Sequence, residues 1–192
     1  VNERIRSIFK LGMIIGAPTT IAFFLFGKPI IGLVLTGGTG GELLSAGAIS
    51  LIFITIAQLS AAVIQGMGKP LRASIHALLA CLVKIIISYV LIRIPQLNIY
   101  GVIHSTTICY FLYGMFNLVY LNKEFSIRLE WRKVVIRPII CAGIMGVLSY
   151  GVYIGMNQLF DSPRVSMLLV IPFAIIVYFV VAVITHTITK ED

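Results

Sequence analysis

A lysine in the middle of an apolar stretch is the first residue of this chain that could do chemistry. Lys84 lies within the run ALLACLVKIIISYVLI. The helical arc around it carries small or polar residues: Ser74, Ala77, Cys81 and Ser88. A charge at the centre of a membrane-spanning helix is costly and normally faces protein or water. We therefore expect Lys84 and Ser88 to line a cavity, and pairing of Lys84 with another helix or a carbonyl is the alternative.

Two more polar stripes lie in neighbouring apolar runs. The first holds Gln58 and Gln65, at a spacing that puts them on one helical face. Glutamines that face lipid are costly, so this face should point inward. Two interpretations stay open for it, namely hydrogen bonding between helices and a polar strip along a transport cavity. The second stripe is Thr106, Tyr110, Tyr113 and Asn117. Aromatic stripes are usually packing, but these hydroxyls and this amide also need partners in lipid.

The first apolar run is the least regular of the chain. Gly12 and Gly16 suit close helix packing, and Pro18 follows them, so we expect a bend near Gly16–Pro18. Lys28 and Pro29 interrupt the same run further on. Lys28 is a cavity candidate, although extension of its side chain to the outer headgroups is the favoured interpretation.

Composition identifies the elements that must position these residues. Hydrophobic residues make up 59% of the chain and charged residues 11%, whereas a soluble domain has about 45–50% and about 25%. The apolar runs are continuous and about 20 residues long, which fits spanning helices and not the alternating strands of a barrel. We therefore predict an all-α integral membrane protein with six transmembrane helices, at about 11–35, 43–65, 75–92, 101–121, 138–157 and 166–187.

Lysine and arginine residues predict the orientation of these spans. Eleven of the 15 lie on one set of flanks and two, Arg93 and Arg164, on the other. The positive-inside rule then puts both ends and residues 122–137 in the cytoplasm, and residues 36–42 and 158–165 outside. The net charge of +8 therefore reflects topology and contact with anionic phospholipids, and no nucleic-acid partner is expected.

The residues of a catalytic or metal centre are too dispersed to form one. No acidic residue lies within a predicted span, and the three histidines stand near span ends. The cysteines Cys81, Cys109 and Cys141 are scattered through three spans. We expect no enzyme activity, no cofactor and no metal.

Several short motifs resemble a known family of transporters. The motif QGMGKP contains Gln65, Gly66, Gly68, Lys69 and Pro70, and we assign it to the cytoplasmic side. It is followed by VKIIISYVLI and by IPQLNIYGVIHSTTICYFLYGMFNLVYL. This order resembles the C-terminal half of polysaccharide-type flippases of the multidrug/oligosaccharidyl-lipid/polysaccharide exporter superfamily. Within it, the chain is most similar to the branch of stage V sporulation protein B and its relatives.

The resemblance implies a transporter of two lobes and about 14 spans that works by alternating access. Residues 1–192 would be its C-terminal lobe, a fragment that begins at Val1 and lacks the N-terminal lobe. The implied substrate is a lipid-linked oligosaccharide or peptidoglycan precursor, moved across the bacterial cytoplasmic membrane in cell-wall synthesis or sporulation. The alternatives are a drug or cation antiporter of the same superfamily and a membrane assembly subunit that does not transport.

Overall fold

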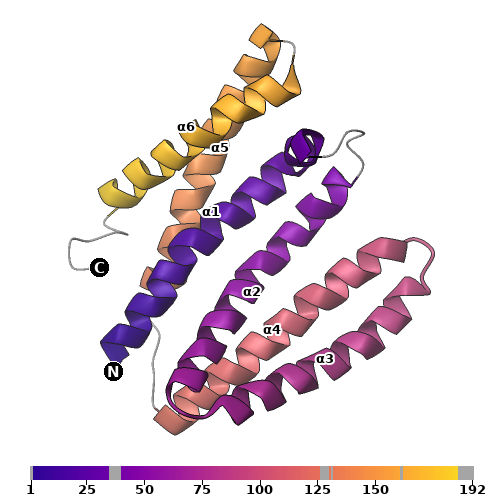
Figure 1. Cartoon of the computed structure of the whole chain (residues 1–192), viewed down its shortest axis with the longest axis vertical. Helices are drawn as coiled ribbons and strands as arrows, with labels where there is room; N and C mark the ends of the chain where they lie inside the picture. The colour runs from indigo at the N-terminus through magenta and orange to yellow at the C-terminus, as the bar shows by residue number, and fades with distance from the viewer. Residues whose placement is uncertain (1, 35–39, 126–129, 131, 161, 186–192) are drawn as a thin grey trace. The chain divides into compact units, whose positions relative to one another are not determined.

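The computed structural model describes residues 2–34, 40–125, 130, 132–160 and 162–185 (Figure 1). In these residues six helices are long and apolar enough to cross a membrane. A π-helical turn, η1 (Arg132–Ile136), leads into the fifth helix. This confirms the predicted all-α, six-span membrane architecture. The helices are α1 (Asn2–Val34), α2 (Gly41–Gly66), α3 (Pro70–Ile92), α4 (Asn98–Phe125), α5 (Arg137–Phe160) and α6 (Pro163–Ile184).

Most helices extend a few residues beyond the predicted spans, because helical hydrogen bonding continues past the apolar residues. The largest extension is in α1, which begins at Asn2 and includes the basic segment before Leu11. Proline occupies the start of α3 and of α6, where its missing N–H has no helical partner to lose. The predicted sixth span ran to Thr187, and residues 186 and 187 lie outside the described part of the chain.

The irregular point of α1 lies later than the predicted bend near Gly16–Pro18. Phe26 of α1 has non-helical dihedral angles, with φ −109° and ψ 17°. It stands one turn before Pro29, whose ring and missing N–H disturb the preceding turn and leave the carbonyl of Leu25 without its helical donor. Pro18 also lies inside α1. The non-helical residue thus precedes Pro29, and the bend near Gly16–Pro18 stays a prediction.

The contacts divide the chain into two compact units. Unit 1 contains residues 1–13 and 49–130, and unit 2 contains residues 14–48 and 131–192. In unit 1, α3 and α4 form an antiparallel hairpin (Figure 1). Glycines permit close packing there, because a Cβ on Gly101 would lie 2.9 Å from the carbonyl carbon of Leu91. Gly114 on α4 faces the backbone of Ala57 on α2, so α2 also packs against this hairpin.

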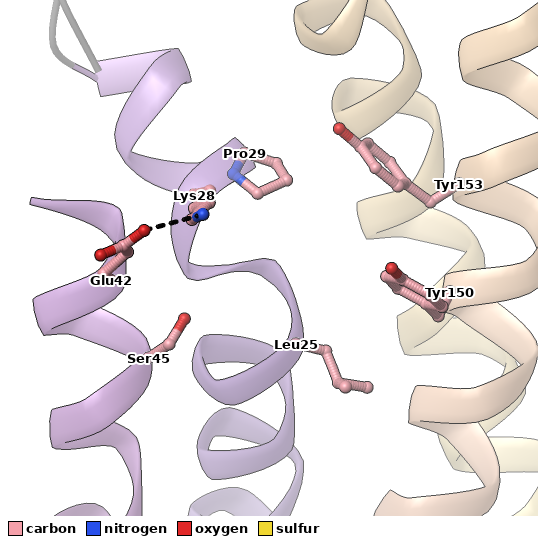
Figure 2. A pocket seen from close by; sticks show the side chains of 7 residues that line it. All are labelled: Leu25, Lys28, Pro29, Glu42, Ser45, Tyr150 and Tyr153. Carbon is pink, nitrogen blue, oxygen red and sulfur yellow. Dashed lines mark ion pairs between the residues drawn. The ribbon is translucent and has the colours of Figure 1, made fainter. Parts of the chain in front are cut away.

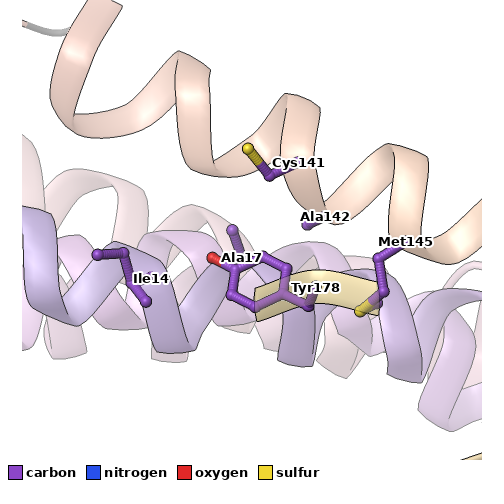
Figure 3. Close-up of a cluster of buried hydrophobic side chains, with 6 residues drawn as sticks. All are labelled: Ile14, Ala17, Cys141, Ala142, Met145 and Tyr178. Atoms are coloured by element: carbon purple, nitrogen blue, oxygen red, sulfur yellow. The ribbon is translucent and has the colours of Figure 1, made fainter. Parts of the chain in front are cut away.

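Unit 2 is built around a small apolar core between α1, α5 and α6 (Figure 3). Small side chains on α5 allow α1 to approach: Ala142 is fully buried, and a Cβ on Gly146 would lie 2.5 Å from Cγ2 of Ile21. This agrees with the small-residue pattern expected where spanning helices pack closely. The buried core residues are Ile14, Ala17, Cys141, Ala142, Met145 and Tyr178.

Candidate functional site

Three polar contacts join α3 to α4 in unit 1. They are Lys69–Glu124 at 2.6 Å, His76–Asn117 at 2.8 Å and Ser88–Ser105 at 2.5 Å. In each pair the two residue numbers add to the same total. Antiparallel helices with the same rise per residue keep such a register along their whole length. The hairpin therefore has one fixed alignment from the α2–α3 turn almost to the α3–α4 loop.

Asn117 links three helices from the centre of unit 1. Its side chain is fully buried, and its Nδ2 donates to the carbonyl oxygen of Ala57 at 3.4 Å. Its Oδ1 can only accept, so Nδ1 of His76 carries the proton and donates to it. Asn117 was expected on a polar stripe with cavity-lining potential. The structure uses it to hold α2, α3 and α4 together.

Ser88 is the second cavity candidate that makes a contact between helices. The hydroxyl of Ser105 donates to the carbonyl of Val102 at 2.9 Å, which leaves the Ser88 hydroxyl to donate to Ser105. Ser105 is fully buried, whereas Ser88 is half-buried. One face of the Ser88 turn is therefore packed against α4 and the other is accessible.

Lys84 keeps the position that made it the leading candidate. The hairpin register places it opposite Cys109, which lies within reach of the Lys84 charge. Its side chain is half-buried, and it makes no hydrogen bond or ion pair with any residue that the structure describes. A spanning helix thus carries an ammonium group at mid-length with room around it.

The glutamine stripe of α2 faces away from the packed interior of unit 1. Gln58 and Gln65 are exposed, while Ala57, Ala61 and Ile64 on the other side of the helix are buried. Neither glutamine side chain has a hydrogen-bond partner among the described residues. The side chains of Gln58 and Gln65 thus form no hydrogen bond to another helix within the described residues, which was one of the two interpretations left open.

The α4 stripe is mixed in its surroundings. The Thr106 hydroxyl donates to the carbonyl of Val102 at 2.8 Å within its own helix. Tyr110 and Tyr113 are half-buried, with part of each ring accessible. Only Asn117 of the four expected residues is enclosed, so the stripe runs from the surface of unit 1 into its core.

The QGMGKP motif forms the turn between α2 and α3. Gly68 has φ +78°, a conformation that favours glycine, and its N–H donates to the carbonyl of Gln65 at 3.0 Å. Gly66 ends α2 and Pro70 begins α3. Gly68 and Pro70 therefore have a local structural reason in this turn.

Lys69 ties this turn to the end of α4. Its ammonium group donates to Glu124 and lies 5.2 Å from the ring centre of Phe125 and 5.9 Å from that of Tyr120. The hydrogen bond to Glu124 is the main cause that raises the pKa of Lys69 above its ordinary value of 10.5, and a hydrogen bond with Tyr120 adds to it. The turn is thus closed by a charge pair and two aromatic rings.

Lys28 lies in unit 2 and is paired with a carboxylate. Its Nζ is 2.9 Å from Oε1 of Glu42, and the two side chains are 69% and 66% exposed. The side chain was expected either to reach the outer headgroups or to line a cavity. It borders a pocket between α1, α2 and α5 (Figure 2).

The sequence interpretation missed several partners of the candidate residues. His76, Ser105 and Glu124 were not selected, although each contacts a residue that was. The short loop between α3 and α4 could have indicated these partners. It makes the two helices antiparallel neighbours, so residues of α3 lie opposite predictable residues of α4. Among the described residues, no group of three histidine, cysteine or acidic side chains is placed to hold a metal ion.

Comparison with known proteins adds no assignment. No protein-family model matches the chain, and no curated protein matches it. The resemblance to polysaccharide-type flippases therefore rests on the sequence motifs alone.

Proposed function

We propose that this chain is part of a flippase that moves a lipid-linked oligosaccharide or peptidoglycan precursor across the bacterial cytoplasmic membrane. The observation that carries the proposal is a set of accessible polar side chains on two successive spanning helices of unit 1. Gln58 and Gln65 project from a spanning helix, and Lys84 projects from the next one without a neutralising partner among the described residues. Such groups are too costly to face lipid, so they require water or protein on that side.

A lipid-linked sugar diphosphate matches the chemistry of these groups. The lipid tail stays in the bilayer while the diphosphate and sugar cross, so the path needs hydrogen-bonding groups on otherwise apolar walls. Lys84 supplies a flexible positive charge for the diphosphate. Gln58 and Gln65 supply both donors and acceptors for the sugar. In this proposal an N-terminal lobe forms the opposite wall, as in the family that the motifs resemble.

The ion pairs of the chain favour this function over a drug or cation antiporter. An antiporter for cations needs carboxylates that are free to bind them in the transport path. Three of the described carboxylates, Glu42, Glu124 and Glu130, stand at or beyond helix ends and bind Lys28, Lys69 and Arg6. Glu3 stands exposed in the first turn of α1, away from the middle of any span. A purely structural subunit, the other alternative, has no need for Lys84 at mid-span.

Binding of a lipid-linked sugar diphosphate to the purified protein tests the proposal. Lys84→Ala should weaken binding about tenfold or more, because a hydrogen bond to a charged group is worth about 1.5–3 kcal/mol. Lys84→Arg should retain most of the affinity, since a hydrated cavity accommodates the larger cation. Lys123→Gln, at the exposed end of α4, is the matched control for lost charge. Unchanged affinity in correctly folded Lys84→Ala would remove Lys84 from the substrate path.

A further inference from the structure

A pocket of 470 Å³ lies within unit 2 between α1, α2 and α5 (Figure 2). This volume is in the range of sites for small molecules, about 300–1,000 Å³. Lys28 and Pro29 of α1 form one side together with Glu42 and Ser45 of α2, and Tyr150 and Tyr153 of α5 form the other. We call it the Lys28–Glu42 pocket. The proposed transport path in unit 1 uses none of these residues.

The local fold explains why a polar pocket forms at this point. Pro29 interrupts α1, and the helix departs from regular geometry at Phe26. The Ser45 hydroxyl donates to the carbonyl of Phe23 at 3.3 Å, so α2 supplies a donor to the disturbed turn. Two glycines let the backbones approach: a Cβ on Gly41 would lie 2.5 Å from Cα of Lys28, and one on Gly27 would lie 2.2 Å from Oγ of Ser45. This contact fixes Lys28 and Glu42 beside each other.

The charges of the pocket cancel. Lys28 and Glu42 are joined at 2.9 Å, and both remain about two-thirds exposed, so a ligand can reach them. The pair offers ammonium donors and carboxylate acceptors without a net charge. A phosphate would meet the Glu42 carboxylate beside the ammonium group, and a cation would meet Lys28 beside the carboxylate. The pocket therefore favours a neutral ligand that both donates and accepts hydrogen bonds.

Two phenol groups face the ion pair from α5. Figure 2 shows Tyr150 and Tyr153 extending from α5 toward the side that carries Lys28 and Ser45. Their rings contact Phe26, with centroids 6.1 Å and 5.7 Å away, and Phe26 is 2% exposed. Neither hydroxyl has a hydrogen-bond partner in the part of the chain that the structure describes. The rings are thus anchored while the hydroxyls are available.

We propose that the Lys28–Glu42 pocket binds the hydroxyl-rich ring of a saccharide. A sugar ring carries hydroxyls that donate and accept around its edge and C–H groups on its faces. The ion pair and the two phenols match the hydroxyls, and the tyrosine rings, Leu25 and Pro29 match the apolar faces. Only the origin of the sugar, the head of a lipid-linked substrate, rests on the proposed function.

The proposal is tested by measuring how an N-acetylglucosamine disaccharide binds to the purified protein. Saturation-transfer NMR detects the binding and calorimetry gives the affinity. Tyr150→Phe and Tyr153→Phe keep the rings on Phe26 and remove only the hydroxyls, so folding is retained. Each should weaken the disaccharide about threefold to tenfold, the effect of one lost neutral hydrogen bond. Tyr100→Phe on α4, a half-buried tyrosine outside both the pocket and the polar stripe, is the matched control and should leave the affinity unchanged. Inorganic phosphate should not displace the disaccharide.

Three results would overturn the pocket as a saccharide site. They are absence of disaccharide binding, unchanged affinity in the Tyr150→Phe/Tyr153→Phe double variant, and displacement by phosphate. A flipping assay with a lipid-linked sugar, done on the full-length protein with its proposed N-terminal lobe, separates this inference from the proposed function. Pocket-dependent disaccharide binding without flipping would leave the pocket standing and reject the flippase. Flipping that does not depend on either tyrosine hydroxyl would leave the flippase standing and would show that the sugar bound in the pocket is not the head of the flipped lipid.

Discussion

Asn117 joins three helices of unit 1 through its buried side chain. Its amide binds His76 on one side and the carbonyl of Ala57 on the other, with no exposure to solvent. Replacement by alanine leaves both partners unpaired inside the unit. A polar contact between spanning helices is worth about 0.6 kcal/mol on average and up to about 1.7 kcal/mol, and Asn117 makes two of them.

Asn117→Ala should therefore lower the free energy of unfolding by about 1–3 kcal/mol. Asn122→Ala changes an exposed residue of the same helix and should have no measurable effect. Denaturant unfolding of the purified protein in detergent micelles measures both. Equal stability of the two variants would show that the Asn117 contacts contribute nothing.

The Lys69–Glu124 pair predicts a pH-dependent contribution to stability. The pKa of Lys69 is raised in the folded protein, mainly by its hydrogen bond to Glu124. A raised pKa stabilises the fold below the unfolded-state value of 10.5, and this contribution is lost as pH rises through the folded-state pKa. Wild type should therefore melt at a higher temperature than Lys69→Gln at neutral pH.

The difference in melting temperature should persist into mildly alkaline solution and disappear in strong alkali, once Lys69 is neutral in both states. Lys123→Gln removes a neighbouring exposed charge of α4 and serves as the control. Identical melting of wild type and Lys69→Gln at neutral pH would show that the pair adds no stability.

At the scale of elements, the α3–α4 hairpin has a register that crosslinking can measure. The hydroxyls of Ser88 and Ser105 are 2.5 Å apart, so cysteines at both positions would be close enough to bond. In a background with Cys81, Cys109 and Cys141 replaced by serine, mild oxidation should join Ser88→Cys to Ser105→Cys within one chain.

An out-of-register pair provides the control for this crosslink. Ser74 lies near the start of α3, whereas Ser105 of α4 contacts Ser88 near the end of α3. Cysteines that replace Ser74 and Ser105 should therefore stay reduced under the same oxidant. Comparable crosslinking of the two pairs would contradict a single register and indicate that α3 slides along α4.

The helices were predictable from the sequence because each is a long apolar run bounded by turn-forming residues. Gly68 and Pro70 between α2 and α3 are one example. The contacts between helices were less predictable. A stripe of polar residues indicates a special face but not its partner, so Asn117 was assigned to a stripe without its bonds to His76 and Ala57. The prolines gave the same difficulty, because Pro18 and Pro29 both lie within α1. The sequence alone does not show which of them is accompanied by non-helical dihedral angles.

For the whole molecule, the distribution of basic residues predicts which connections face the cytoplasm. In a cysteine-free background, Ser162→Cys before α6 should react with a membrane-impermeant maleimide added from outside intact cells. Asn122→Cys at the exposed end of α4 should react only after permeabilisation. The reason is the eleven-to-two bias of lysine and arginine. The reverse labelling pattern would invert the topology and place the Lys28–Glu42 pocket on the cytoplasmic side.

We propose that the accessible polar side chains of unit 1, Gln58, Gln65 and Lys84, serve the passage of a lipid-linked sugar. The most direct test reconstitutes the full-length protein, with its proposed N-terminal lobe, in liposomes that contain a fluorescent lipid-linked sugar. A membrane-impermeant reductant then measures how fast the label exchanges between leaflets. We expect faster exchange than in protein-free liposomes, and a loss of most of this rate in Lys84→Ala and in Gln58→Leu/Gln65→Leu. Exchange no faster than in protein-free liposomes, or efflux of a cationic dye in its place, would contradict it.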